Sequence, residues 1–382
     1  NRCALLEKML EEERQARENE RLERENLEKT NLSNLKTINN DTYSTVTNNQ
    51  QQILDEQKFT SYRHEPNNPN SLSSNGVTCL FEDKNGILWI GTERGGLNVF
   101  DKKAKTFKRY FQSDSQSAIS FDNITSIQSD AKGNMIIGTR GQGLGILQKG
   151  SNKIIQFNKE NTPELQTNVI KNILLSEAGK IWITTAKGIK QLHSDKQNNF
   201  FITKPFNEED ALSKVFNTSD FLSIEECPKG VMWFGTENNG LLKYDTKSKK
   251  KEQFQNDSKV LNSIPSNSIW SLHGDRDDIL WLGFYFKGLA KIDPLEQKFR
   301  PTYHFTDEEN TLYNLDLVSS FAEAKDGTFW VGMDGSGLYR VKPDGSVTFF
   351  NENSGHNLEN NNITDIELDD EGTLYVSTWG AG

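Results

Sequence analysis

Apolar residues recur along most of this chain in short runs that are separated by glycines and polar turns. The most regular feature is an aromatic or aliphatic anchor residue that is followed, two positions later, by Gly, Ser or Thr. Nine and twelve residues before each anchor the side chain is apolar, and three residues before it stands Gly or, once, Asp278. The anchors recur at intervals of 45 to 51 residues, at Trp89, Ile136, Trp182, Trp233, Trp281, Trp330 and Tyr375. Self-similarity at such a period predicts a fold built from repeated structural units.

The first complete copy indicates what each unit contains. Residues 77–82 and 87–92 are apolar-rich runs on either side of a glycine turn, and residues 97–100 and 106–111 follow after a short loop. Runs enriched in β-branched and aromatic residues, with Gly, Asn and Asp between them, are typical of strands. Four antiparallel strands repeated at this period are typical of a β-propeller blade, whose faces are buried only against neighbouring blades. We therefore expect an all-β fold, a seven-bladed β-propeller of four-stranded antiparallel blades.

The two ends of the repeat region predict how such a ring closes. Residues 57–63 resemble a fourth strand without earlier strands of its own, and the last copy reaches Gly382 after its second strand. We expect residues 57–63 to close the last, truncated blade, whose third strand is missing or is supplied by sequence beyond Gly382. The propeller then comprises residues 57–382.

The first 56 residues have a different composition. Residues 1–35 are rich in Glu and Arg at helical spacing and predict a charged helix, whose broken leucine pattern favours a solvated single helix over a weak coiled coil. Residues 36–56 are rich in Asn, Thr and Gln, which predicts a flexible polar linker.

Charge and motif content exclude several functional classes. A net charge of -10 argues against nonspecific nucleic-acid contact, which depends on neutralising phosphates. The sequence contains no apolar run long enough to cross a bilayer, no phosphate-binding loop and no HExxH motif, and its three cysteines are widely separated. We accordingly assign no catalytic residue, no metal ligand and no cofactor.

The repeated elements resemble a known family. Residues 85–92 and 96–101, echoed by residues 231–236 and 240–245, are similar to the two-component regulator propeller repeat. This resemblance implies the periplasmic sensor region of a Bacteroides-type hybrid two-component system, on the periplasmic side of the inner membrane as part of a membrane-anchored sensor. It further implies an oligosaccharide ligand and additional domains of the same sensor, and it leaves a homodimer open.

The candidate site lies in the loops that connect the second and third strands of each unit. These loops vary while their flanks repeat, as expected of a recognition surface carried on a regular scaffold. Aromatic residues in them suit stacking on sugar faces, and charged residues suit bonds to hydroxyls, carboxylates or sulfates. The alternative is that the aromatic residues pack between blades and the charges are simply solvated. The candidate ligand-binding residues are Arg94, Arg140, Gln142, Glu237, Tyr285, Phe286, Lys287 and Trp379.

Three functional classes remain in competition at this point. The favoured one is a non-catalytic, ligand-sensing input module of a hybrid sensor histidine kinase. The second is a propeller that serves as a protein–protein interaction scaffold, and the third, disfavoured by the missing catalytic constellation, is a glycan-processing enzyme.

Overall fold

Short antiparallel strands make up nearly all of the chain that the computed structural model describes. The described residues are 60–110, 122–151, 154–207, 210–257, 259–260, 263–292, 299–302, 304–306, 312–315, 317–356 and 358–382. The helix predicted at 1–35, the linker predicted at 36–56 and residues 57–59 lie outside these ranges.

Six four-stranded antiparallel sheets follow one another along the chain. The first contains β1 (Val77–Glu82), β2 (Ile87–Thr92), β3 (Gly96–Asp101) and β4 (Thr106–Tyr110), and the second β5 (Ile124–Ser129), β6 (Met135–Thr139), β7 (Leu144–Leu147) and β8 (Ile154–Phe157). The third contains β9 (Ile170–Leu175), β10 (Ile181–Thr185), β11 (Gly188–Ser194) and β12 (Phe200–Thr203), and the fourth β13 (Phe221–Glu226), β14 (Val231–Thr236), β15 (Leu241–Asp245) and β16 (Lys251–Phe254). The fifth contains β17 (Ile269–Gly274), β18 (Leu280–Phe284), β19 (Leu289–Ile292) and β20 (Phe299–Thr302), and the sixth β23 (Val318–Glu323), β24 (Phe329–Met333), β25 (Gly337–Val341) and β26 (Val347–Phe350).

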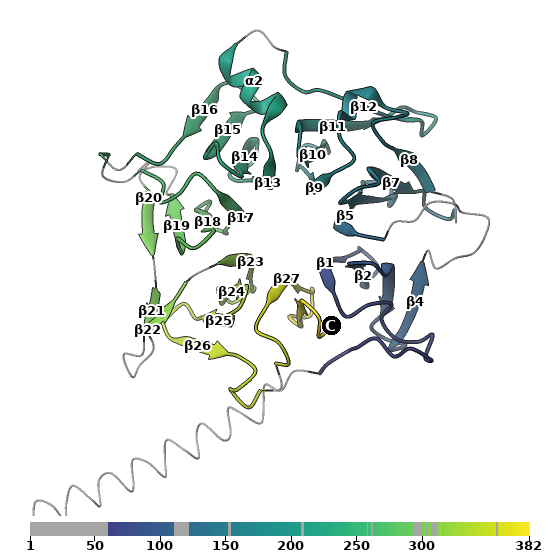
Figure 1. Cartoon of the computed structure of the whole chain (residues 1–382), viewed down its shortest axis with the longest axis vertical. Helices are drawn as coiled ribbons and strands as arrows, with labels where there is room; N and C mark the ends of the chain where they lie inside the picture. Colours follow the sequence, from purple (N-terminus) through teal and green to yellow (C-terminus); the bar gives the residue numbers. More distant parts are fainter. Residues whose placement is uncertain are drawn as a thin grey trace, which may run out of the picture. The chain divides into compact units, whose positions relative to one another are not determined.

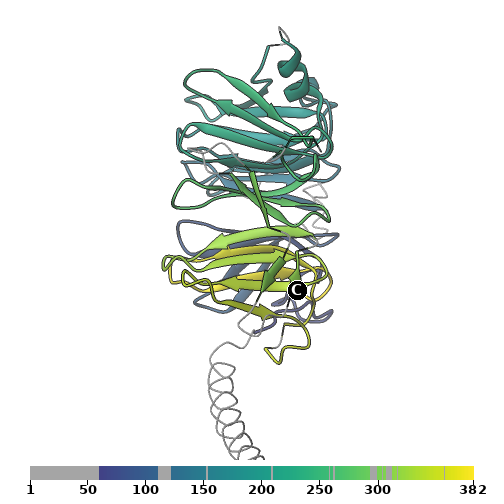
Figure 2. The same ribbon diagram turned by 90° about the vertical axis from the view of Figure 1, so that its left-hand side faces the viewer.

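These sheets are arranged around a common centre as the blades of a β-propeller (Figure 1). The first strand of each blade lies innermost and the fourth lies outermost, so the chain crosses from the rim of one blade to the centre of the next. Seen from the side, the connecting turns and loops gather at two opposite faces of the ring (Figure 2). The prediction of an all-β propeller with four-stranded antiparallel blades is therefore confirmed.

The seventh place in the ring holds a two-stranded sheet. It consists of β27 (Ile363–Leu368) and β28 (Leu374–Thr378), and β27 packs against β23 on one side and β1 on the other. The sequence predicted seven four-stranded blades, the last of them truncated. Among the described residues, the structure has six complete four-stranded blades and one two-stranded sheet in the seventh place.

Three short insertions were not predicted from the sequence. A 3₁₀ turn, η1 (Pro163–Leu165), precedes β9, and the helix α2 (Ala211–Thr218) lies between the third and fourth blades. A separate hairpin of β21 (His304–Thr306) and β22 (Leu312–Asn314) lies between the fifth and sixth blades. Helix α2 begins with a polar cap, because the Asp210 carboxylate accepts a hydrogen bond of 2.7 Å from the Ser213 backbone amide.

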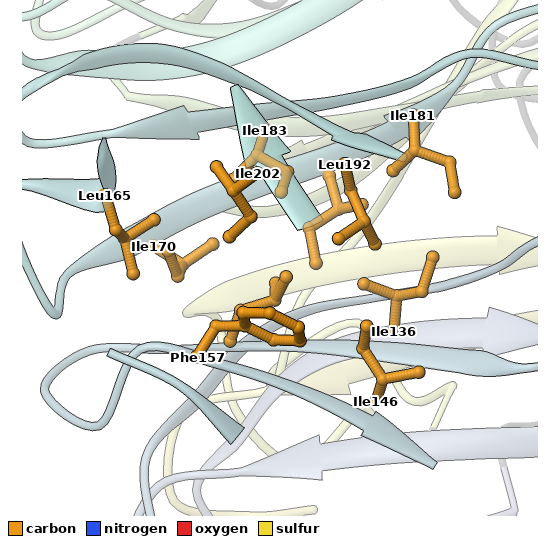
Figure 3. Close-up of a cluster of buried hydrophobic side chains, with 11 residues drawn as sticks. Ile136, Ile146, Phe157, Leu165, Ile170, Ile181, Ile183, Leu192 and Ile202 are labelled. Carbon is orange, nitrogen blue, oxygen red and sulfur yellow. The ribbon is translucent and has the colours of Figure 1, made fainter. Parts of the chain in front are cut away.

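Each interface between blades has its own apolar core. Between the second and third blades, Ile136, Ile146 and Phe157 face Ile183 and Ile202 across a layer of buried side chains (Figure 3). The Gly, Ser or Thr two residues after each anchor permits this close approach: a Cβ atom at Gly138 would lie 2.7 Å from the Ile170 side chain of the next blade. Separate thin cores allow the chain to exceed the usual size of a single-core domain.

The last and first blades are also joined by polar contacts. The Thr364 hydroxyl donates to the Val77 carbonyl oxygen at 2.7 Å, and the Leu80 backbone amide donates to the Asp365 carboxylate at 2.8 Å. The Lys102 ammonium group completes the junction with ion pairs of 2.7 Å to Glu82 and 2.8 Å to Asp369. These bonds close the ring between residues nearly three hundred positions apart in the sequence.

Residues 60–62 lie where a fourth strand of the seventh blade would be expected. In the second, fourth and sixth blades, a Cβ atom on the glycine before the third strand would collide with the carbonyl oxygen of the last residue of the fourth strand. Gly382 stands in the same relation to the Tyr62 carbonyl oxygen. We propose on this basis that the segment predicted at 57–63 takes the place of the fourth strand and closes the ring.

Candidate ligand-binding site

One face of the propeller, which we call the mouth, carries the loops between the second and third strands of the blades. A hydrogen-bond pattern that repeats from blade to blade organises this face. In six of the seven units, all but the fifth, the residue four positions after the anchor donates its backbone amide to the carbonyl oxygen of the residue before the first strand, as Glu93 does to Gly76 at 2.7 Å. The glycine before the third strand donates to the residue that enters the next blade, as Gly143 does to Asn168 at 3.0 Å. Gly382 donates in the same way to Asn75 at 3.1 Å, so the pattern continues across the closure. The loops that carry Arg94, Arg140, Glu237 and Trp379 are therefore held at fixed positions around this mouth, and the loop of the fifth blade is closed by a bond of 3.0 Å from the Phe284 amide to the Gly288 carbonyl oxygen.

Two of the candidate residues adopt a backbone conformation that side chains rarely take. At the position five residues after the anchor, the sixth and seventh blades have Gly335 and Gly380, both with φ of 93°. The first and fifth blades have Arg94 with φ of 62° and Phe286 with φ of 51° at this position. A side chain in this region costs about 1 kcal/mol or more and is commonly found where function requires the side chain. Glycine could adopt this backbone conformation without that cost. Arg94 and Phe286 therefore occupy positions where their side chains lower the stability of the loop.

The fifth blade presents three exposed aromatic rings in contact with one another. Trp270, Tyr285 and Phe286 are 40%, 45% and 61% exposed. The Trp270 and Tyr285 rings are stacked with their centroids 5.4 Å apart, and Phe286 meets Tyr285 edge-on at 4.4 Å. We call these three residues the aromatic platform. Their exposure is what stacking on a ligand requires, in contrast to rings that pack between blades.

Trp270 was not among the residues selected from the sequence. It lies in the innermost strand β17, where an apolar residue is readily taken for part of the core. The equivalent position in other blades holds Thr78, Thr125 or Thr364, each of which donates its hydroxyl to a carbonyl oxygen of the next blade. A comparison of the seven copies at this one position would have singled out the tryptophan.

Trp379 carries a fourth exposed ring at the mouth. The side chain is 42% exposed, and its backbone amide donates to the Asn362 carbonyl oxygen at 2.9 Å. It lies on the seventh sheet, in the loop equivalent to that of Tyr285 in the fifth blade.

The polar candidates are presented by neighbouring loops. Arg94 and Arg140 are exposed and flank Asn123: the Arg94 amide donates to the Asn123 side-chain oxygen at 3.2 Å, and the Arg140 amide donates to its carbonyl oxygen at 2.9 Å. Lys287 is exposed and Glu237 is partly buried.

Gln142 lies two residues beyond Arg140 in the same loop. Its side-chain oxygen Oε1 is buried and has no hydrogen-bond partner among the described residues. Its backbone oxygen, in contrast, accepts a bond of 2.8 Å from Gln156. An acceptor left unpaired beside the mouth is suited to a hydroxyl donor from a ligand or from water.

Strongly perturbed acids lie between blades. Burial raises the pKa of Glu225 to about 8, where its carboxylate accepts the Gly274 backbone amide of the next blade at 3.2 Å. Burial also raises the pKa of Glu367 to about 8, and its carboxylate accepts the Glu82 amide at 3.4 Å. These shifts have a structural cause in the packing of adjacent inner strands. In the parts of the chain that the structure describes, no three His, Cys, Asp or Glu side chains converge to hold a metal ion.

The same described ranges contain no helix that is long and apolar enough to cross a membrane.

Three segments of the chain match a known family model. The family model described as two component regulator propeller matches residues 71–94, 263–286 and 357–380. Each matched segment contains the first two strands of a blade and reaches the mouth loop that follows them.

Relatives share this fold over most of the chain. Histidine kinase P4 of Formosa agariphila is 25% identical over 307 residues, which are 80% of this chain and 22% of that protein. The extracellular domain of a hybrid two component system of B. thetaiotaomicron aligns with a TM-score of 0.66 at 21% identity, over 85% of this chain and 41% of that one. PorZ, a surface component of the type-IX secretion system of Porphyromonas gingivalis, aligns with a TM-score of 0.62 at 20% identity, over 83% of this chain and 47% of that one.

The chain spans less than half the length of each of these three relatives. Its anchors, its mouth loops and the three matched segments all follow one repeat. Three segments of the chain thus match the two-component regulator propeller repeat, and the solved structures share its propeller fold.

Proposed function

We propose that this propeller is the ligand-sensing input module of a hybrid two-component sensor histidine kinase, and that it is not itself catalytic. The observation that carries the proposal is the construction of the mouth. A regular hydrogen-bonded frame holds exposed aromatic and cationic side chains, two of them at left-handed backbone positions that glycine occupies in other blades. Such side chains are retained because they contact something outside the fold.

The ligand of this module is an oligosaccharide. The C–H groups on one face of a pyranose ring carry partial positive charge, so they pack favourably on the negative face of an aromatic ring. The aromatic platform and Trp379 offer such faces, while Arg94, Arg140, Gln142, Glu237 and Lys287 offer hydrogen bonds to hydroxyl groups. This combination of flat apolar faces and polar groups matches the surface of a sugar better than that of a purely apolar ligand.

The relatives support a location and a set of partner domains for this propeller. Histidine kinase P4 and the hybrid two component system of B. thetaiotaomicron support a protein in which this propeller is extracytoplasmic, on the periplasmic side of an anchored receptor. Further domains of the same sensor, and a second copy of it in a homodimer, are the partners through which binding would be transmitted. The propeller contributes a rigid frame, and the signal arises from altered packing against those partners.

The test is calorimetric titration of the purified chain with oligosaccharides of several glycan classes, preceded by a thermal-shift screen of the same panel. Tyr285→Ala should weaken binding of a detected ligand about tenfold, which corresponds to about 1.4 kcal/mol, without lowering the melting temperature. Phe201→Ala is a matched control, because Phe201 is 49% exposed but lies on the outer strand β12. Equal affinities of the native chain and the Tyr285→Ala variant would remove this mouth as the site.

One observation on the outer strands supports the alternative that the propeller is a protein–protein interaction scaffold. Phe201 is exposed and stacks on His193 at 5.2 Å, and Ile155 on β8 is 36% exposed. Exposed apolar side chains of this kind are typical of protein contacts. Recovery of a protein partner whose binding depends on Phe201 and not on Tyr285, with no glycan bound, would establish the scaffold instead.

A further inference from the structure

Basic side chains gather on one arc of the mouth. Arg94, Arg140 and Lys187 come from the corresponding loops of the first, second and third blades, and all three are exposed. Arg94 and Arg140 are brought together by Asn123, which accepts the backbone amide of each. We call these three residues the basic arc.

The basic arc lacks acidic partners. Among the residues that the structure describes, none of its three side chains forms an ion pair, although the chain has 54 acidic and 44 basic residues. Exposed lysines elsewhere form ion pairs, as Lys229 does with Glu177 at 2.7 Å. The acids that neighbour this arc in sequence, Glu93 and Asp122, form no ion pair with it among the described residues. Three unpaired cations in adjacent loops of an acidic chain indicate a surface built for negative charge.

A buried lysine adds to the positive charge beneath this arc. Lys190 is fully buried, and its ammonium group donates to the Lys187 carbonyl oxygen at 2.7 Å and to the Gln166 side-chain oxygen at 3.3 Å. No carboxylate pairs with it among the described residues. Burial, together with the charge of Lys204, lowers its pKa to about 8.

The aromatic platform lies on another arc of the same mouth. Its strand β17 lies across the centre of the ring from β1 and β5, the innermost strands of the first and second blades (Figure 1). Arg94 and Arg140 belong to these two blades, in the β2–β3 and β6–β7 loops. A chain of several sugar units is a ligand that can place one ring on the aromatic platform and a charged group on the basic arc.

We propose that the ligand is an oligosaccharide that carries anionic groups, carboxylate or sulfate, with these groups bound by Arg94, Arg140 and Lys187 and an uncharged ring face stacked on Trp270, Tyr285 and Phe286. This inference rests on the proposed function, because it assumes that the mouth binds an oligosaccharide. Guanidinium groups suit both anions, since their planar donors bind carboxylate or sulfate oxygens in pairs.

The experiment compares charged probes with neutral forms of the same sugar. Hexagalacturonate is titrated against its fully methyl-esterified form, and a sulfated galactan oligosaccharide against its desulfated form, with the whole chain and calorimetric detection. We expect the charged member of at least one pair to bind at least tenfold more tightly than its neutral counterpart. Preference within the first pair identifies carboxylate as the recognised group, and preference within the second identifies sulfate.

Two variants with the same change of net charge locate the effect. Arg94→Ala combined with Arg140→Ala should weaken binding of the charged probe at least tenfold while the melting temperature is kept. Lys84→Ala combined with Lys149→Ala removes two exposed lysines from turns at the opposite face of the ring and should leave the affinity unchanged.

Three outcomes overturn the inference in different ways. Equal binding of charged and neutral probes would leave the proposed oligosaccharide site standing and remove the anionic specificity. Equal losses in the two double variants would show nonspecific attraction of polyanions. Binding of no probe in any form, with none from the wider glycan panel, would remove the proposed function together with this inference.

Discussion

The backbone at Arg94 allows a prediction in which stability and binding change in opposite directions. With φ of 62°, Arg94 lies in the left-handed region, where Gly335 and Gly380 lie in the sixth and seventh blades. Replacing Arg94 by Gly relieves this strain, and the loop keeps its bond to Asn123 because the bond uses the backbone amide. The variant should therefore fold more stably and bind the ligand more weakly.

The magnitude follows from two opposing terms. A left-handed conformation costs an ordinary residue about 1 to 2 kcal/mol, whereas glycine loses an additional 0.5 to 1 kcal/mol or so of chain entropy on folding. The difference leaves a net stabilisation of about 0.75 kcal/mol for Arg94→Gly, the centre of a range from about 0 to 1.5 kcal/mol. Loss of the guanidinium group should at the same time lower the affinity for an anionic ligand about tenfold.

Arg140→Gly supplies the matched control. Arg140 is also an exposed arginine of the mouth, but its φ is not positive, so glycine brings only the entropy cost of about 0.5 to 1 kcal/mol. In urea unfolding, the midpoint should rise for Arg94→Gly and fall for Arg140→Gly, while both variants lose affinity. A fall of the midpoint in both variants would refute the account of backbone strain at Arg94.

Two further predictions concern the interfaces between blades. Because burial raises the folded-state pKa of Glu225 from 4.5 to about 8, its contribution to stability is complete below about pH 4.5 and is lost as the pH rises towards 8. Glu225→Gln should therefore be stabilising relative to the native chain at pH 8 and near neutral at pH 4.5, and urea midpoints with the same pH slope in both proteins would contradict this. The buried indole Nε1 of Trp182 has no hydrogen-bond partner within the described part of the chain, whereas that of Trp233 donates to the Cys227 carbonyl oxygen. Trp182→Phe should therefore cost about 1 to 2 kcal/mol less in unfolding free energy than Trp233→Phe, and equal costs would show that packing alone decides both.

The strands of each blade were predictable because their signals are local. Residues 77–82 and 87–92 were predicted as strands and are observed as β1 and β2 with the same bounds, since two short apolar-rich runs lie on either side of a glycine turn. The insertions were not predicted. Helix α2 is only eight residues long, too short to give a clear periodic signal, and it is stabilised by burial of Phe216 against Phe206 and Phe234.

The loops that carry the candidate residues were predictable from the sequence, and the site itself stays a proposal. The exposure of Tyr285, Phe286 and Trp379 agrees with the prediction that they are available to a ligand, and their role in binding stays a proposal. Trp270 and Lys190 were missed, because one lies in a strand and the other is fully buried. Both became visible only when residues distant in sequence were brought next to the mouth loops.

The sequence alone determined the repeat, the strand pattern within each blade and the loops that vary, because these depend on spacing and residue type along the chain. Only the tertiary structure decided how the ring closes and which side chains share the mouth. Closure depends on contacts such as those from Asp365 to Leu80 and from Gly382 to Asn75, which join residues from the two ends of the repeat region. Contacts over such distances leave no local signature, since they are selected by the packing of whole blades and not by the neighbours of each residue.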